Sequence, residues 1–186
     1  TEIERRAYAD RTEHMGDPDF WDVPIDMLKS KGYAKKRIHD INMRKATPSK
    51  AVYAGNADIY ESPETTHYSV VDQWGNAVSV TTTINLSYGN GCVVEGAGFF
   101  LNNEMDDFSA KPGVPNAFGL VGNEANAISP DKRPLSSMTP TIVLKNNKPF
   151  LIVGSPGGST IITSVFQTIL NVSKTKIKIY GINGDN

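Results

Sequence analysis

The first 43 residues repeat apolar positions at the spacing of a helix and carry charged residues between them. Helices are predicted before Gly16, over Ile25–Lys31 and over Tyr33–Met43, with Gly32 expected to separate the last two. No side chain in these segments stands out as a catalytic group. We therefore predict a solvated helical layer at the start of the chain.

Further along, apolar and polar residues follow the patterns of two β-hairpins. β-branched and aromatic residues recur over Thr66–Val71, and a Trp-Gly turn leads to a second strand, Ala77–Ile84. A second pair is predicted over Thr139–Lys145 and Phe150–Val153, joined by an Asn-Asn turn. Each pair is expected to form an antiparallel hairpin.

The remaining segments are one helix, one short strand and long connections. An apolar helix is predicted over Thr160–Val172, and a short strand over Phe99–Leu101. Residues 44–64 form a linker that contains prolines and glycines. Lys111–Lys132 is too long for a routine connection and suits a lid. This mixture of helices and hairpins predicts an α+β fold.

The composition narrows the classes of function. The chain has 186 residues and a net charge of −1, so no strong field attracts nucleic acid or an anionic membrane. A single cysteine, Cys92, excludes an internal disulfide and a cysteine metal cluster. His14, His39 and His67 match no metal-ligand spacing. We predict no metal and no cofactor, and the charged start without Met suggests that the chain begins within a longer protein.

Thr65 stands between a polar, proline-containing segment and the first predicted strand. If the Glu64–Thr65 bond were cut, Thr65 would become an N-terminal nucleophile with its own α-amine as the base. Such an amine titrates near 7.7–8.0, so it can accept a proton at neutral pH. Thr83, near the end of the second predicted strand, could point at the same site as Thr65. The plain alternative is that Thr65 simply precedes an ordinary strand.

Two other stretches offer chemistry that complements a nucleophile. Asn102–Phe108 gathers amides and carboxylates, which indicates an exposed acidic turn, a site for a cationic amine or, less favoured, a divalent metal. Gly157 and Gly158 lie at a strand-to-helix turn, where backbone N–H groups can bind an anion. A plain flexible turn is the alternative there. A phosphate-binding loop is excluded because its lysine and spacing are missing.

Four blocks of sequence together carry a family resemblance. In chain order they are Thr65–Val70, Asn102–Ser109, Lys132–Met138 and Gly154–Ser159. In this order and spacing the chain resembles bacterial γ-glutamyltranspeptidase (γ-glutamyltransferase), an N-terminal-nucleophile hydrolase. The resemblance extends from Gly16 to about Asn171 and leaves Lys174–Gly181 unmatched.

The resemblance implies a fold and a processing step. The family's fold is a four-layer αββα sandwich, which would be incomplete here, and its precursor cuts itself before the nucleophilic threonine. Residues 1–64 would be the C-terminal part of the large subunit, with helices and a processing linker. Residues 65–186 would be a truncated small subunit that carries the nucleophile. The family's carboxylate-binding arginine lies earlier in the large subunit, so the fragment alone is expected to be inactive.

The resemblance also assigns roles to single residues. Thr65 would attack the γ-glutamyl carbonyl of glutathione or a related amide, and Thr83 would hydrogen-bond this nucleophile. Gly157 and Gly158 would donate backbone N–H groups to the oxyanion. The remaining residues would bind the substrate's α-amine (Asn85, Glu104, Asp107) and its α-carboxylate (Ser136, Ser137).

The implied partners are a γ-glutamyl small molecule, an amino-acid or dipeptide acceptor, and the rest of the large subunit; a homo-oligomer remains open. The implied location is the periplasm or the exterior of the cell. Two alternatives remain at this point: another acylase of the superfamily, of the cephalosporin acylase type, or an uncleaved, non-catalytic remnant. The headgroup residues Asp107, Ser136 and Ser137 favour the γ-glutamyl substrate.

Overall fold

The computed structural model describes residues 1–48, 51–52, 65–117 and 119–174. The chain divides into two compact units. Unit 1 combines Thr1–Ser62 with Ile84–Ser136, and unit 2 combines Pro63–Thr83 with Ser137–Asn186. Unit 1 therefore takes residues from both predicted subunits, whereas every described residue of unit 2 belongs to the predicted small subunit. The Glu64–Thr65 bond itself is outside the described residues, because Glu64 is not among them.

Unit 1 begins with three helices, as its apolar spacing predicts. They are α1 (Glu2–His14), α2 (Ile25–Lys29) and α3 (Lys31–Ile38). Glu2 and Glu4 lie in the first turn of α1 and Arg11 lies in its last turn, so the charges complement the helix dipole at both ends.

The predicted boundary at Gly32 is wrong. Ser30 ends α2 and caps α3, because its hydroxyl accepts a hydrogen bond from the Tyr33 backbone N–H at 3.1 Å. Gly32 consequently lies inside the first turn of α3. The third helix ends at Ile38 and does not reach Met43.

Charged side chains, many of them shielded from water, fix α1 to the rest of unit 1. Arg6 is only 4% exposed, and its guanidinium pairs with Glu2 at 2.6 Å and Asp40 at 2.9 Å. One turn later, Asp10 accepts a hydrogen bond from the Tyr33 hydroxyl at 3.0 Å. Because a buried charge is costly unless it is paired, these partners make the position of α1 specific.

A second ion pair connects the end of α1 to the segment that precedes Ser136. Asp17 is 4% exposed and accepts hydrogen bonds from the Arg133 Nε and backbone N–H, both at 2.9 Å. The Arg133 guanidinium holds the pKa of Asp17 far below its usual range. Next to it, a Cβ on Gly16 would lie 2.1 Å from the Ala125 carbonyl oxygen, so only glycine permits this approach.

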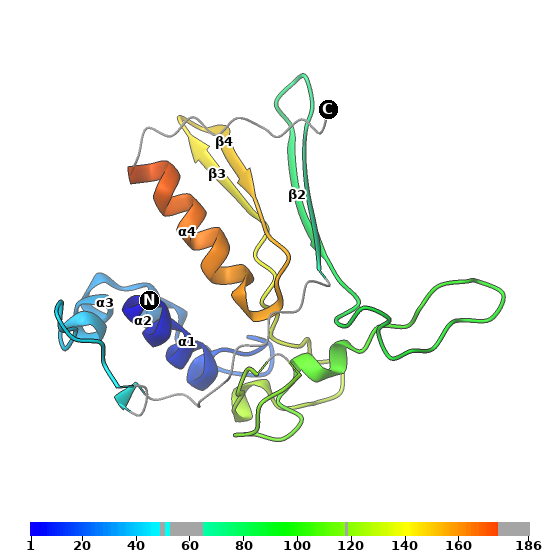
Figure 1. Ribbon diagram of the computed structural model, residues 1–186, viewed down its shortest axis with the longest axis horizontal. Coiled ribbons are helices and arrows are strands. Elements are labelled where there is room, and N and C mark those ends of the chain that lie inside the picture. Colours follow the sequence, from blue (N-terminus) through cyan, green and yellow to red (C-terminus); the bar gives the residue numbers. More distant parts are fainter. Residues whose placement is uncertain (49–50, 53–64, 118, 175–186) are drawn as a thin grey trace. The chain divides into compact units, whose positions relative to one another are not determined.

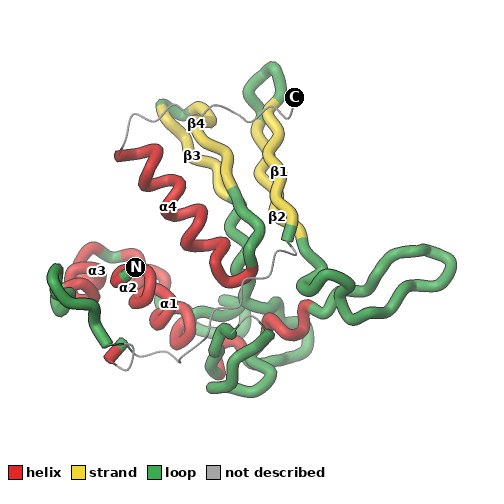
Figure 2. Tube along the Cα trace, viewed as in Figure 1, coloured by secondary structure: helices red, strands yellow, loops and turns green. Residues whose placement is uncertain are grey.

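The part of unit 1 between the hairpins is mostly loop (Figure 2). Its regular pieces are two short 3-10 helices, η2 (Glu104–Asp107) and η3 (Glu124–Asn126). The stretch expected to form a lid, Lys111–Lys132, folds back on itself, with the Gly113 N–H donating to the Gly122 carbonyl at 2.9 Å. Its role as a lid stays a prediction.

The predicted strand Phe99–Leu101 does not form. The structure has only an isolated bridge between Val93 and Phe100. Gly96 and Gly98 adopt φ values of +79° and +73°, and these left-handed residues turn the chain before a ladder can grow. Apolar runs of three residues carry too little information to separate a strand from an extended loop.

Unit 2 contains the two predicted hairpins and the apolar helix (Figure 1). The elements are β1 (Thr66–Val71), β2 (Ala77–Thr82), β3 (Thr141–Lys145), β4 (Lys148–Val153) and α4 (Ile161–Lys174). Each hairpin is a two-stranded antiparallel sheet, and β2 adjoins the second hairpin. The Ser79 hydroxyl donates to the Val153 carbonyl at 3.3 Å. The four-layer sandwich stays a prediction.

Among the described residues of unit 2, the fully buried apolar side chains lie at the start of α4. Ile161 and Val165 at the start of α4 are 1% and 2% exposed. In contrast, Tyr68 and Val70 of β1 and Val78 of β2 remain 50%, 54% and 51% exposed. Across the described residues, no helix combines the length and the apolar character that a membrane crossing needs.

Candidate active site

The predicted site residues fall into two sets, one in each unit. Unit 2 holds those predicted to do the acyl-transfer chemistry, together with one serine of the carboxylate pair: Thr65, Thr83, Gly157, Gly158 and Ser137. Unit 1 holds the others: Asn85, Glu104, Asp107 and Ser136. The contacts within each set are described in turn.

Thr65 is the residue immediately before β1 and is partly buried. The outermost registered pair of the hairpin is Thr66 with Thr82. Continuing this antiparallel register by one residue places Thr65 opposite Thr83. This register favours the predicted hydrogen bond between the two hydroxyls, although their roles stay predictions.

His67 connects β1, the strand that follows Thr65, to the glycine loop. Its Nδ1 lies 2.8 Å from the Thr81 hydroxyl, and its Nε2 lies 3.0 Å from the Ser69 hydroxyl. A Cβ on Gly154 would lie only 2.0 Å from His67 Nδ1, so the loop backbone rests against the imidazole ring. Gly154 is three residues before Gly157, so this contact fixes where the loop begins.

The glycine pair forms the turn into α4. Gly157 and Gly158 have φ values of +125° and +52°, a region that side-chain-bearing residues rarely adopt. Gly158 begins a 3-10 turn that continues into α4, and the Thr160 hydroxyl donates to the Gly157 carbonyl at 2.8 Å. The backbone N–H groups of this turn are at the positive end of the helix dipole, which suits a developing oxyanion.

Glu104 and Asp107 lie on η2, where side chains three residues apart share one face. Both are partly buried, which fits an amine site better than a fully exposed acidic turn. Burial, together with the hydrogen bond and negative charge of Asp107, raises the pKa of Glu104 to about 7. Burial also raises the pKa of Asp107, and the positive charge of Arg11 opposes that rise. The described residues contain no cluster of three or more acidic, histidine or cysteine side chains arranged for a metal ion.

Asn85 is anchored next to this acidic turn. It is 4% exposed and adopts φ +76°, which asparagine tolerates better than most residues. Its amide donates to the Asn103 carbonyl at 3.1 Å, and the Leu86 N–H donates to the Asn103 side chain at 3.1 Å. Since Asn103 precedes Glu104, these bonds bring Asn85 and the acidic turn together.

The serine pair lies where unit 1 meets unit 2 in the sequence. Ser136 is exposed and Ser137 is partly buried. The Leu135 N–H donates to the Asn126 side chain at 3.0 Å, and the Thr139 hydroxyl donates to the Ser137 carbonyl at 2.9 Å. Hydrogen bonds thus hold the backbone on both sides of the pair.

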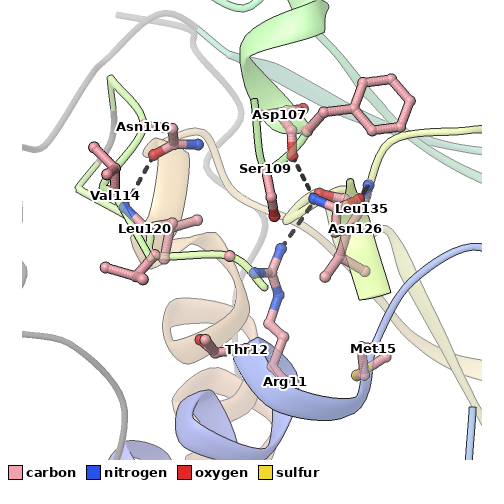
Figure 3. Close-up of a pocket in the computed structure, with 13 residues that line it drawn as sticks. Arg11, Thr12, Met15, Asp107, Ser109, Val114, Asn116, Leu120, Asn126 and Leu135 are labelled. Carbon is pink, nitrogen blue, oxygen red and sulfur yellow. Dashed lines mark hydrogen bonds between the residues drawn. The ribbon is translucent and has the colours of Figure 1, made fainter. Parts of the chain in front are cut away.

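Two side chains next to Asp107 were missed by sequence reasoning. They are those of Arg11 and Asn126 (Figure 3). Both line a small cavity of about 20 Å³ beside Asp107, which has room for one water molecule. Arg11 donates to the Leu135 carbonyl at 3.4 Å, and burial lowers its pKa. The Ser109 hydroxyl, in the wall of the same cavity, is buried without a hydrogen-bond partner among the described residues. Arg11 was missed because helical spacing gives no sign of a partner so distant in sequence.

Comparison with known proteins places the chain in a family. The family model described as Gamma-glutamyltranspeptidase matches residues 1–181. The match is longer than the resemblance found by motifs, and it includes Lys174–Gly181, which the sequence analysis left unmatched. That exclusion was therefore wrong, because isolated motifs detect only the most distinctive positions.

Curated relatives and solved structures agree with this match. The "Glutathione hydrolase proenzyme" of Escherichia coli is 58% identical over 91% of this chain, and that of Pseudomonas aeruginosa is 54% identical over 92%. A crystal structure of a Helicobacter pylori γ-glutamyltranspeptidase variant is 70% identical, with a TM-score of 0.60 over 61% of each chain. The chain spans 29% and 30% of the length of the two curated relatives. The chain belongs to the γ-glutamyltranspeptidase family.

Proposed function

We propose that this chain is part of a γ-glutamyltransferase and hydrolase that acts on glutathione and related γ-glutamyl amides. A precursor would cut itself before Thr65, and the new α-amine would then serve as the base for the Thr65 hydroxyl. The "proenzyme" in the names of the curated relatives supports a processed precursor. Those names do not favour the cephalosporin acylase alternative.

The reaction proceeds in two acyl-transfer steps. The Thr65 oxygen attacks the γ-glutamyl carbonyl while its proton passes to the α-amine of the same residue. The oxyanion receives hydrogen bonds from the N–H groups of Gly157 and Gly158, and Thr83 orients the nucleophile. Collapse of this intermediate expels the amine of the substrate, which takes up the proton. Water or an acceptor amine then attacks the ester and releases the γ-glutamyl group.

The unit 1 residues recognise the amino-acid headgroup of the substrate. Glu104 and Asp107, with Asn85 beside them, hold the α-ammonium group. Ser136 and Ser137 bind the α-carboxylate through their hydroxyls. Acids for an ammonium and hydroxyls for a carboxylate match the two charges of this headgroup.

One observation carries the proposal: the register of β1 and β2 sets Thr65 opposite Thr83, and the same strand contacts the glycine loop through His67. Thr65 thus has the hydroxyl of Thr83 opposite it, and the glycine loop proposed to bind the oxyanion is anchored in the same unit. An ordinary strand start needs neither feature.

The processing step is tested by the intact mass of the protein. Cleavage separates residues 1–64 from residues 65–186, and Thr65→Ala is expected to abolish it. Thr66→Ala is the matched control, because this neighbouring threonine is exposed on β1. Cleavage that persists in Thr65→Ala, or is lost equally in Thr66→Ala, would contradict Thr65 as the nucleophile.

The activity is tested by hydrolysis of a γ-glutamyl anilide. Two proteins are compared: the 186-residue chain, and the full-length precursor, by which we mean this chain within a protein as long as its relatives. The full-length precursor is expected to be active and the chain alone inactive. Faster turnover of a glutaryl anilide than of the γ-glutamyl anilide would instead indicate a cephalosporin acylase type of enzyme. An uncleaved precursor that binds but does not turn over would indicate a non-catalytic remnant.

The full-length precursor is also proposed to complete the αββα sandwich. The apolar residues exposed on the hairpins support this, since the other sandwich layers would cover them. The rest of the large subunit would remain bound after cleavage. Export to the periplasm or the medium is proposed from the family alone, and cell fractionation tests it: a cytoplasmic enzyme would contradict it.

A further inference from the structure

The side chain of Asn126 connects the two segments that are proposed to bind the substrate headgroup. Its Nδ2 donates to the Asp107 carbonyl at 2.7 Å, and its Oδ1 accepts from the Leu135 N–H at 3.0 Å. Leu135 directly precedes Ser136. One carboxamide therefore spans from the acidic turn, which would hold the α-amine, to the serine segment, which would hold the α-carboxylate.

The surroundings of Asn126 make this connection rigid. The residue is only 6% exposed, so water competes little for either hydrogen bond. Its backbone carbonyl accepts from the Ser109 N–H at 2.9 Å. The Lys132 ammonium donates to the carbonyls of Ala125 and Ala127, both at 2.9 Å, and so holds the turn on both sides of Asn126. Figure 3 shows Asn126 next to Asp107 and Leu135.

We propose that Asn126 is a positioning residue that fixes the separation of the α-amine and α-carboxylate sites. The inference rests on the proposed function, because it concerns the same substrate. A carboxamide carries its donor and its acceptor on two separate atoms, which lets one side chain serve the Asp107 carbonyl and the Leu135 N–H at the same time. Neither bond reaches a substrate atom, so Asn126 acts through Asp107 and Ser136.

Two substitutions separate the two halves of this connection. Asn126→Ala removes both hydrogen bonds. Asn126→Asp keeps the shape and the acceptor for Leu135 but removes the donor to Asp107. Lys132→Met is the matched control, because it weakens the same turn through Ala125 and Ala127 without removing either contact of Asn126.

The experiment measures kcat and KM of the full-length precursor for three anilides. The γ-glutamyl anilide carries the complete headgroup, the glutaryl anilide lacks the α-amine, and the 4-aminobutyryl anilide lacks the α-carboxylate. Asn126→Ala is expected to raise KM for the γ-glutamyl substrate about tenfold with a smaller change in kcat. The preference of this variant for the γ-glutamyl anilide over both analogues should fall by a similar factor. Asn126→Asp should lose preference mainly against the glutaryl substrate.

The Lys132→Met control tests the positioning role of Asn126, and the wild-type enzyme tests the proposed function. Lys132→Met should lower the melting temperature and reduce the substrate preferences much less than Asn126→Ala does, because both hydrogen bonds of the Asn126 side chain remain. Wild-type preferences in Asn126→Asp, or an equal loss in Lys132→Met, would overturn the positioning role, and Asn126→Asp gives this answer even if Asn126→Ala does not fold. A wild-type enzyme without preference for the complete headgroup would contradict the proposed function instead.

Discussion

The two units of this chain are stabilised in different ways. Unit 1 shields charged groups and pairs them: Arg6 and Asp17 are each 4% exposed and have ionic partners. Unit 2 leaves apolar strand residues in contact with water, among them Val70 at 54% and Leu144 at 59% exposure. Both units expose large apolar side chains, but unit 1 is also held together by shielded, paired charges, and in unit 2 the exposed apolar residues lie mainly on the two hairpins.

This difference matches the tasks proposed for each unit. Recognition of an amino-acid headgroup requires polar groups at fixed positions, and fully satisfied hydrogen-bond networks give such precision. The threonine chemistry instead requires a rigid strand start and a glycine turn, which the hairpins provide once their faces are covered. We therefore compare one glycine in each unit. An added methyl group at Gly16 in unit 1 would meet backbone atoms, whereas one at Gly154 in unit 2 would meet a side chain, which can move.

The largest effect is expected for Gly16→Ala in unit 1. The new Cβ would meet the backbone oxygen of Ala125 at 2.1 Å, and backbone cannot turn away as a side chain can. We expect a loss of about 2–3 kcal/mol or more in the free energy of unfolding, measured by urea denaturation. Hydrogen exchange should rise in peptides of unit 1, including those around Asp17 and Ala125.

Gly32→Ala is the matched control, because no atom lies within 4 Å of the position of its Cβ. It lies within α3, so the substitution should stabilise the protein, by up to about 1 kcal/mol. A Gly16→Ala protein as stable as Gly32→Ala would show that the approach of Gly16 to Ala125 is not required.

A smaller and repairable effect is expected for Gly154→Ala in unit 2. Here the Cβ would meet the His67 ring at 2.0 Å, and a ring can move or be removed. We expect a loss of about 1–3 kcal/mol in the free energy of unfolding and slower turnover, since the glycine loop would shift from the strand of Thr65. The double variant Gly154→Ala with His67→Ala should recover part of both losses.

The same double variant distinguishes steric from conformational causes. Recovery supports the contact between the loop and the imidazole. Equal damage in the single and double variants would show that His67 is not the obstacle, and that Gly154 acts through its backbone alone. A mutant cycle of the four proteins gives the coupling directly.

The sequence predicted the hairpins well because their signals are local. β-branched residues over Thr66–Val71 and the Trp-Gly turn define a strand and its register, and that register leads to Thr83. The motifs likewise identified the acidic turn at Glu104. What failed were boundaries and distant partners: Ser30 replaced Gly32 as the helix boundary because a side-chain cap decides where a short helix begins.

Asn126 and Arg11 could not be predicted for a different reason. Their importance comes from contacts with Asp107 and Leu135, and only folding brings these segments together. Polar residues in loops or on a charged helix look like solvated surface in a sequence. The pairing of the buried Asp17 with Arg133, separated by 116 positions, was hidden in the same way.

The smallest effect is expected from Glu104→Gln, and it concerns pH. The pKa of Glu104 is raised to about 7, so this group gains its negative charge as the pH rises from about 6 to about 8. A newly formed carboxylate attracts the α-ammonium group of the ligand, so L-glutamate should inhibit the full-length precursor more strongly, by a few-fold, over this range. In Glu104→Gln the side chain is neutral throughout, and the inhibition constant should lose this dependence while remaining close to the wild-type value at the lower pH. If the variant keeps the wild-type pH profile, another group titrates in the headgroup site, and the precise polar arrangement attributed to unit 1 does not include Glu104.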